Sequence, residues 1–200
     1  MKSKLPTAAK VLFIFLFVFG FSNLAIAQNT IDWSPDYKLQ LSDFQSPGTE
    51  IGSNLYSIHS PAGMDFSFQM SLAQFMFTKN FNSKVNCTFQ KSAASITAPD
   101  TKSAELLLHF AQYGFDLAEL YARKFRKELH DNKGTFSDIN YVKPIYEQIQ
   151  NEYAKRLADA GKITELGKKE LVLKDLHITV LAEINSYPDY CKSCKPSKHK

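Results

Sequence analysis

The stretch LLLHFAQYGFDLAELYARKFRKEL, residues 106–129, carries residue types that could hold a metal ion or move a proton. It contains one histidine, His109, followed by two carboxylates, Asp116 and Glu119. A zinc hydrolase helix needs histidines at i and i+4, which hold Zn²⁺ from one helix face, and a glutamate that activates the bound water. The stretch offers candidate site residues without this motif. No two histidines of the chain have the required spacing, and the others are His59, His130, His177 and His199.

The element that must position these residues is a long helix. Apolar residues recur at alternating steps of four and three over residues 104–129, which predicts the core stripe of a helix. Asp100 or Thr101 can cap its start, and Asn-Lys-Gly at 132–134 can end it. A second apolar stripe beside the first predicts that more than half of the circumference is buried. The remaining face is expected to be a charged helix surface and carries Glu105, Gln112, Asp116, Glu119 and Arg123.

The chain before this helix is rich in strand patterns. Residues 64–72, MDFSFQMSL, alternate strictly between apolar and polar side chains, which is typical of a half-buried strand. Further strands are expected at 54–60 and at 85–96, and a short element is expected at 39–44. These segments together predict a sheet in the first half of the chain.

The chain after the central helix is helical in pattern. A second helix is expected at 137–160, ended by Gly161, and a third at 168–186. Strands followed by helices predict an α+β fold, in which an antiparallel sheet in the first half precedes a long central helix and two further helices. The length predicts a single domain over residues 28–187.

The first 27 residues have the order of a secretory signal peptide: three lysines, an apolar run at 11–21, and the small-residue cleavage site Ala-Ile-Ala at 25–27. The run is too short to span a bilayer, and no later segment is long and apolar enough to do so. Cleavage near Ala27 predicts an exported protein of 173 residues, periplasmic or extracellular. Because the signal holds three lysines and no acids, the net charge falls from +4 to about +1, which gives no support for nucleic-acid binding.

Three cysteines, Cys87, Cys191 and Cys194, become available for disulfides in an oxidising compartment. Two of the three can pair, and the sequence does not decide which two. Residues 188–200 are expected to be a flexible tail with four lysines. Two less favoured functions remain for this tail. Thiol chemistry at Cys-Lys-Ser-Cys lacks the strand-then-helix setting of a redox motif. A zinc site formed by Cys191, Cys194 and His199 is one ligand short of the four that a structural site needs.

Gln112 and the run FDLAELYARK at 115–124 resemble the central helix of a family of exported bacterial zinc metalloproteases, which reads LLxHEQxHFDIAExYARK. Trp33 and the LxDF of residues 41–44 resemble an earlier landmark of that family, and residues 80–84 resemble the loop before its helix. The similarity covers nearly all of the mature chain, and the helix is its specific part. The resemblance implies a zincin-like domain with its site on the central helix.

The zinc and base positions of the family are lost in this chain. When the helices are aligned on their shared Phe-Asp pair, Phe110 and Gly114 stand where the family has its two zinc histidines. Ala111 stands where it has the catalytic glutamate. None of these side chains can donate an electron pair to zinc or take a proton. His109 lies one residue early, about 100° around the helix from Phe110 and beside Asp116, and is therefore expected to be a polar-face residue.

The resemblance implies a scaffold that has lost its metal chemistry. A downstream Tyr-Asp-x-Glu-Thr-x-His stretch of the family corresponds to residues 153–159, which lack its Asp, Glu and His. Phe110 and its neighbours are expected to fill the cleft. We expect an exported, non-catalytic relative without a cofactor, which acts as a binding or structural module for a protein, peptide or envelope ligand. The alternative is an atypical metal-dependent peptidase or hydrolase that uses His109, Asp116 and Glu119 in the same cleft, and only this alternative requires zinc.

Overall fold

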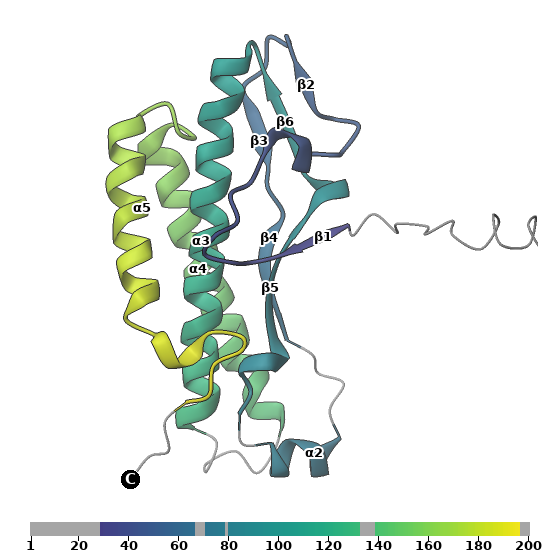
Figure 1. Ribbon diagram of the computed structural model, residues 1–200, viewed down its shortest axis with the longest axis vertical. Helices are drawn as coiled ribbons and strands as arrows, with labels where there is room; N and C mark the ends of the chain where they lie inside the picture. Colours follow the sequence, from purple (N-terminus) through teal and green to yellow (C-terminus); the bar gives the residue numbers. More distant parts are fainter. Residues whose placement is uncertain (1–28, 67–70, 79, 133–138, 197–200) are drawn as a thin grey trace, which may run out of the picture.

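The computed structural model describes residues 29–66, 71–78, 80–132 and 139–196, so the expected signal peptide lies outside the described residues. Figure 1 shows an elongated molecule with helices on one side and short strands on the other, and helix α3 (Thr101–Asp131) runs between them. α3 contacts both later helices and four of the strands. The predicted α+β class, with a long central helix and two further helices, is therefore confirmed.

Two small sheets replace the single antiparallel sheet that the sequence predicts. In the first sheet, β5 (Val85–Gln90) lies between β1 (Thr30–Asp32) and β4 (Ala62–Phe66). Both of these pairings are antiparallel. The side chains of β5 alternate between buried and less buried positions, and the buried ones pack against α3.

The second sheet contains one parallel pair. β6 (Ser95–Ala98) is parallel to β2 (Glu50–Ile51) and antiparallel to β3 (Ser57–His59). The predicted single strand at 85–96 is therefore wrong. A 3₁₀ turn at Lys91–Ala93 ends β5 and leads the chain into the other sheet. The side chains of this turn lie toward solvent, so the alternation of buried positions stops there.

The predicted strand at 64–72 is confirmed only in its first part. β4 ends at Phe66, and Met64 and Phe66 are buried as the alternation predicts. Residues 67–70 lie outside the described residues. The prediction for the last residues is wrong, because a helix begins there.

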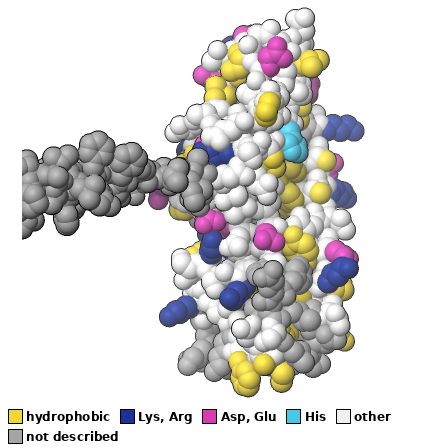
Figure 2. Space-filling view, turned by 90° about the vertical axis from the view of Figure 1, so that its right-hand side faces the viewer, with side chains coloured by type: hydrophobic (Ala, Val, Ile, Leu, Met, Phe, Trp, Pro, Cys, Tyr) yellow, Lys and Arg dark blue, Asp and Glu magenta, His cyan; other side chains and the backbone are white. Residues whose placement is uncertain are grey.

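Helix α2 (Leu72–Phe77) starts with a capping box. Ser71 Oγ accepts a hydrogen bond from the backbone N–H of Gln74, and the Gln74 side chain accepts one from the backbone N–H of Ser71. This Ser-x-x-Gln signal is present in the sequence and outweighs the alternating pattern. Figure 2 shows hydrophobic side chains at the lower end of the molecule, where α2 lies, and Met76 and Phe77 are both exposed.

The three long helices match the predicted ones. The carboxylate of Asp100 caps α3 by accepting a hydrogen bond from the backbone N–H of Ser103, at 2.7 Å. α4 (Val142–Thr164) and α5 (Glu170–Asn185) follow. The expected end of α3 at 132–134 falls mostly outside the described residues. Within the described ranges, no helix is long and apolar enough to cross a membrane.

α4 runs past Gly161, so the prediction that this glycine ends the helix is wrong. An added Cβ at Gly161 would lie 3.2 Å from Cζ of Phe110, and the glycine therefore allows α4 to pack closely on α3. The turn into α5 is made at Gly167, which has a φ of +97°. A Cβ there would lie 2.4 Å from the carbonyl oxygen of Leu106. Both the backbone angle and the available space require glycine at this turn.

Residues 188–196, the first part of the expected flexible tail, lie against the body of the protein. A disulfide joins Cys191 to Cys194, and Cys87 is a buried free thiol. The side-chain amides of Asn80 and Asn82 donate to the carbonyl oxygen of Cys194 at 2.9 and 3.0 Å. These bonds hold the disulfide loop beside the chain segment that precedes β5.

Candidate functional site

The three positions that the resemblance assigns to zinc and its base lie within the buried part of α3. Phe110, Ala111 and Gly114 are all buried. The Phe110 ring stacks on Tyr113 with 6.2 Å between ring centroids. An added Cβ at Gly114 would lie 3.3 Å from Cδ1 of Leu157 in α4. α3 and α4 therefore make an apolar contact at positions that the resemblance assigns to zinc, and Phe110 and Leu157 also line an open hollow of about 560 Å³ on this side.

The residues of α4 at 153–159 are committed to other contacts. The Tyr153 hydroxyl is buried and donates to the carbonyl oxygen of Ala62 at 3.1 Å. Arg156 forms two hydrogen bonds to the carboxylate of Glu183 in α5, at 2.5 and 3.0 Å. In the part of the chain that the structure describes, no group of three or more His, Cys, Asp or Glu residues could hold a metal ion.

Asp116 is the centre of a buried hydrogen-bond network, so the prediction that its face of α3 is a charged surface is wrong. Trp33 Nε1 donates to Oδ1 at 2.7 Å, and Gln112 Nε2 donates to Oδ2 at 3.1 Å. His177 Nε2 lies 2.6 Å from the same Oδ2. Burial alone raises the pKa of Asp116, but these three partners outweigh burial and hold the pKa below its usual value. The carboxylate is therefore ionised and fixes the orientation of the His177 ring.

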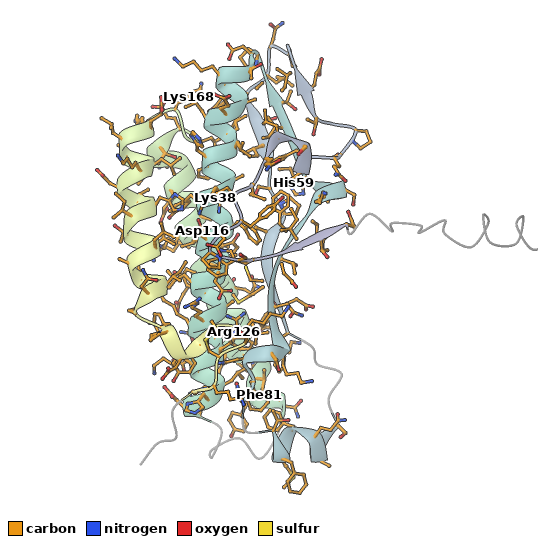
Figure 3. All side chains as sticks on the ribbon, in the orientation of Figure 1. Lys38, His59, Phe81, Asp116, Arg126 and Lys168 are labelled. Atoms are coloured by element: carbon orange, nitrogen blue, oxygen red, sulfur yellow. A yellow bond between two sulfur atoms is a disulfide. The ribbon has the colours of Figure 1, made fainter. Side chains whose placement is uncertain are left out.

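The N-terminal segment, residues 33–40, is held across α3 by this network. Besides the contact from Trp33, the backbone N–H of Leu39 donates to Gln112 Oε1 at 2.8 Å. Figure 3 marks Asp116 about midway along α3 and Arg126 nearer its C-terminal end. The N-terminal segment thus covers a polar stripe that would otherwise face solvent.

A second buried network lies further along α3. Oε1 of Glu119 accepts hydrogen bonds from Arg123 Nε and Arg126 Nη1, both at 2.9 Å. Arg123 also donates to two carbonyl oxygens at and after the end of α5. Arg126 donates to one carbonyl oxygen in β5 and to one in the 3₁₀ turn that follows α5. Its Nε is buried without a partner among the described residues. Buried ions are tolerated when they are paired and hydrogen-bonded, so these residues tie β5 and the C-terminal turn to α3.

A cavity of about 560 Å³ lies between α3, α5 and the N-terminal segment, and we call it the α3–α5 cavity. His109 lies at its wall and is exposed. The ring of His177 lies between the cavity and Asp116. Its walls combine leucines with polar and charged side chains from both helices. The residues that line it are Lys38, Leu39, Leu108, His109, Gln112, Gly167, Glu170, Leu171, Leu173, Lys174 and His177.

The structure does not bring the three sequence-predicted candidates together. His109 lines the α3–α5 cavity, and Asp116 lies behind His177 at the same place. Glu119 instead lines a separate cavity of about 330 Å³, with Cys87 and Cys191. A site that uses His109, Asp116 and Glu119 as one cluster therefore has no support in the geometry.

Sequence reasoning missed Lys38, Lys174 and His177 as residues of the candidate site. Lys174 and His177 are three residues apart in the predicted helix at 168–186, so a shared helix face could have been inferred. The contact between His177 and Asp116 joins residues 61 positions apart and has no local signal.

Comparisons with protein-family models, with curated proteins and with solved structures found no match to the chain. The relation to the zinc metalloproteases therefore depends on the sequence resemblance alone. The candidate site is defined by its own geometry, which is a mixed apolar and charged cavity backed by a buried carboxylate.

Proposed function

We propose that the protein is an exported, non-catalytic relative of the zinc metalloproteases, with a zincin-like domain, that binds a ligand in the α3–α5 cavity. One observation carries the proposal. The helix positions that zinc and its base require are Phe110 and Gly114, which pack against α4, and Ala111, which is buried, whereas a mixed apolar and charged cavity opens on another face of α3. The ligand is a protein, a peptide or a component of the cell envelope.

The residues shared with the family support a scaffold role. Trp33, Gln112, Asp116, Glu119 and Arg123 belong to the quoted motifs and lie in the two buried networks. The guanidinium of Arg123 also lies over the Trp33 ring, 5.6 Å from its centroid. A chain that keeps these contacts and loses the metal ligands keeps the fold without its chemistry.

Export is proposed from the signal-peptide pattern at residues 1–27. The disulfide between Cys191 and Cys194 supports an oxidising compartment, where such bonds persist. All described residues follow the expected cleavage position near Ala27, so cleavage would leave the described fold intact. N-terminal sequencing of the protein from the periplasm or medium tests this, and a chain that keeps residues 1–27 in the cytoplasm would contradict it.

Metal analysis tests the non-catalytic proposal directly. Protein purified after expression of the full chain is dialysed, and its metal content is measured by plasma mass spectrometry. We expect zinc well below one ion per chain and no cleavage of an unfolded protein substrate that a metal chelator could inhibit. One tightly held zinc per chain, or chelator-sensitive proteolysis, would overturn the proposal.

A second candidate is hydrolysis at the α3–α5 cavity, because Asp116 orients His177 as acid–base catalysis requires. No Ser, Thr or Cys is among the described residues that line this cavity, so the attacking group would have to be water. Hydrolysis of p-nitrophenyl dodecanoate by the protein and by His177→Gln tests this candidate. Turnover that disappears in the variant would establish it and would rule out the non-catalytic proposal.

A further inference from the structure

We propose that the α3–α5 cavity binds an aliphatic carboxylate, a molecule with an apolar chain and one anionic end. The inference rests on the proposed function, because it names the class of ligand for the same cavity. It combines two features of the lining: leucines on both helices, and two lysines at the rim. A volume of about 560 Å³ lies within the range of cavities that bind small molecules.

The charged residues of the cavity favour one anionic group. Lys38 and Lys174 line it, and neither forms an ion pair within the described chain. Glu170 is the one acidic residue of the lining and offsets one lysine. This balance disfavours a cationic ligand, and the described residues of the lining include no arginine, the side chain that polyphosphate recognition typically uses.

The buried carboxylate behind the wall does not cancel this preference. Asp116 already accepts hydrogen bonds from Trp33 and Gln112 and contacts His177, so its charge is satisfied inside the protein. The side chain of His177 is 24% exposed at the cavity wall, where its contact with Asp116 fixes the position of the ring.

The apolar part of the lining continues outside the cavity. Leu39 and Leu173 are buried in its wall, whereas Leu171 at its mouth is 78% exposed. Ile178 follows Leu171 two helical turns along α5 and is 56% exposed. An aliphatic chain that leaves the cavity could cover both exposed side chains, which otherwise present apolar surface to water.

The walls disfavour a peptide as the occupant. A peptide in extended form binds through backbone hydrogen bonds to an open sheet edge. Most residues that line this cavity instead belong to α3 and α5, whose backbone groups bond mainly within the helices. In the non-helical part of the lining, the N–H of Leu39 donates to Gln112 and that of Gly167 to Thr164. A ligand with a single polar end needs no such sheet edge.

Isothermal titration calorimetry with dodecanoate below its micellar concentration tests the inference. We expect one dodecanoate to bind per chain, dodecanol to bind more weakly, and dodecyltrimethylammonium and acetate to show no binding. Added salt should weaken dodecanoate and leave dodecanol unchanged, because it screens the lysines. Equal affinity for dodecanoate and dodecanol would overturn the assignment of an anionic end, and absence of dodecanoate binding would overturn the whole inference.

Variants locate the binding to this cavity. Lys38→Gln and Lys174→Gln should each weaken dodecanoate binding by about fivefold, the effect of losing roughly 1 kcal/mol of exposed ion pairing. Leu171→Asp should abolish binding without unfolding the protein, because this residue is largely exposed. Lys155→Gln, an exposed position of α4 outside the cavity, is the control and should bind as the original chain does. Binding that the cavity variants leave unchanged would overturn the inference.

The two proposals fail in different measurements. A zinc-free protein that does not bind dodecanoate refutes the ligand class and leaves the non-catalytic proposal in place. A protein that retains zinc refutes the non-catalytic proposal, whatever dodecanoate does.

Discussion

Replacing Glu119 by glutamine should strongly destabilise the protein, although the change is nearly isosteric. Glu119 is the carboxylate partner of both Arg123 and Arg126, and the exposed side-chain fractions are 3% for Glu119, 10% for Arg123 and 0% for Arg126. Breaking a buried ion pair from one side costs about 3–5 kcal/mol, because the remaining charge stays buried without its partner. We expect about 3 kcal/mol for Glu119→Gln, since the amide oxygen can still accept one hydrogen bond.

Urea unfolding followed by two probes measures this effect. Far-ultraviolet circular dichroism reports the helices, and the fluorescence of Trp33, the single tryptophan, reports the network itself. Coincident curves would justify a two-state treatment. Glu147→Gln is the matched control, because Glu147 pairs with Lys143 while 59% of its side chain is exposed. Its cost should stay below about 0.5 kcal/mol.

A double-mutant cycle separates the ion pair from local packing. If the charge pairing is the cause, Glu119→Gln together with Arg126→Met should cost less than the sum of the two single changes, because the double variant leaves one unmatched arginine, Arg123, where Glu119→Gln alone leaves two. A cost below about 1 kcal/mol for Glu119→Gln, or strict additivity in the cycle, would refute the assignment of this network as a buried electrostatic anchor.

Three further predictions follow from the described contacts. Gly167→Ala should lower the free energy of unfolding by at least about 2 kcal/mol, because the residue has positive φ and its Cβ would meet the carbonyl of Leu106. The control is Gly63→Ala, which should be nearly neutral because there is open space at its Cβ. Equal effects of the two changes on urea unfolding would contradict this reasoning. The hydrogen-bond partners of Asp116 lower its pKa by more than burial raises it. As pH falls, the unfolded chain therefore binds the proton at a higher pH than the folded chain does. The stabilisation from the ionised Asp116 is then complete above about pH 5 and is lost as pH falls through the folded-state pKa. The difference in free energy of unfolding between the original chain and Asp116→Asn should shrink in the same way, and a difference that stays constant from neutral to acidic pH would count against this prediction. Burial also raises the pKa of the Cys87 thiol, so Ellman's reagent should detect no thiol in the native protein. In urea without reductant it should detect one thiol per chain, whereas three thiols per chain would exclude the disulfide.

The elements with strong local signals were predictable from the sequence. The apolar period of α3 and the Asp100 cap predicted the central helix. The first part of the alternating run gave β4. Misplaced boundaries came from competing signals of similar strength: the capping box at Ser71 ended the strand pattern, and the packing of Gly161 on Phe110 carried α4 past a residue that often ends helices.

The candidate site was predictable only in part. His109 was singled out in the sequence and does line the cavity, but as an exposed wall residue. The polar face of α3 looked like helix surface, because a wheel shows which residues share a face and not what covers that face. Covering it required the N-terminal segment and α5, which meet it only in the folded chain.

By itself, the sequence determined that the central helix carries no zinc motif, because folding cannot give Phe110, Ala111 or Gly114 a group that binds metal or takes a proton. It also determined the order of strands and helices, which local patterns encode. Only the tertiary structure decided that Asp116 is buried and that it joins Trp33 and His177, which lie 83 and 61 positions away along the chain. Contacts at such separations depend on how the elements pack, and this packing is what places the two lysines and the leucines around one cavity.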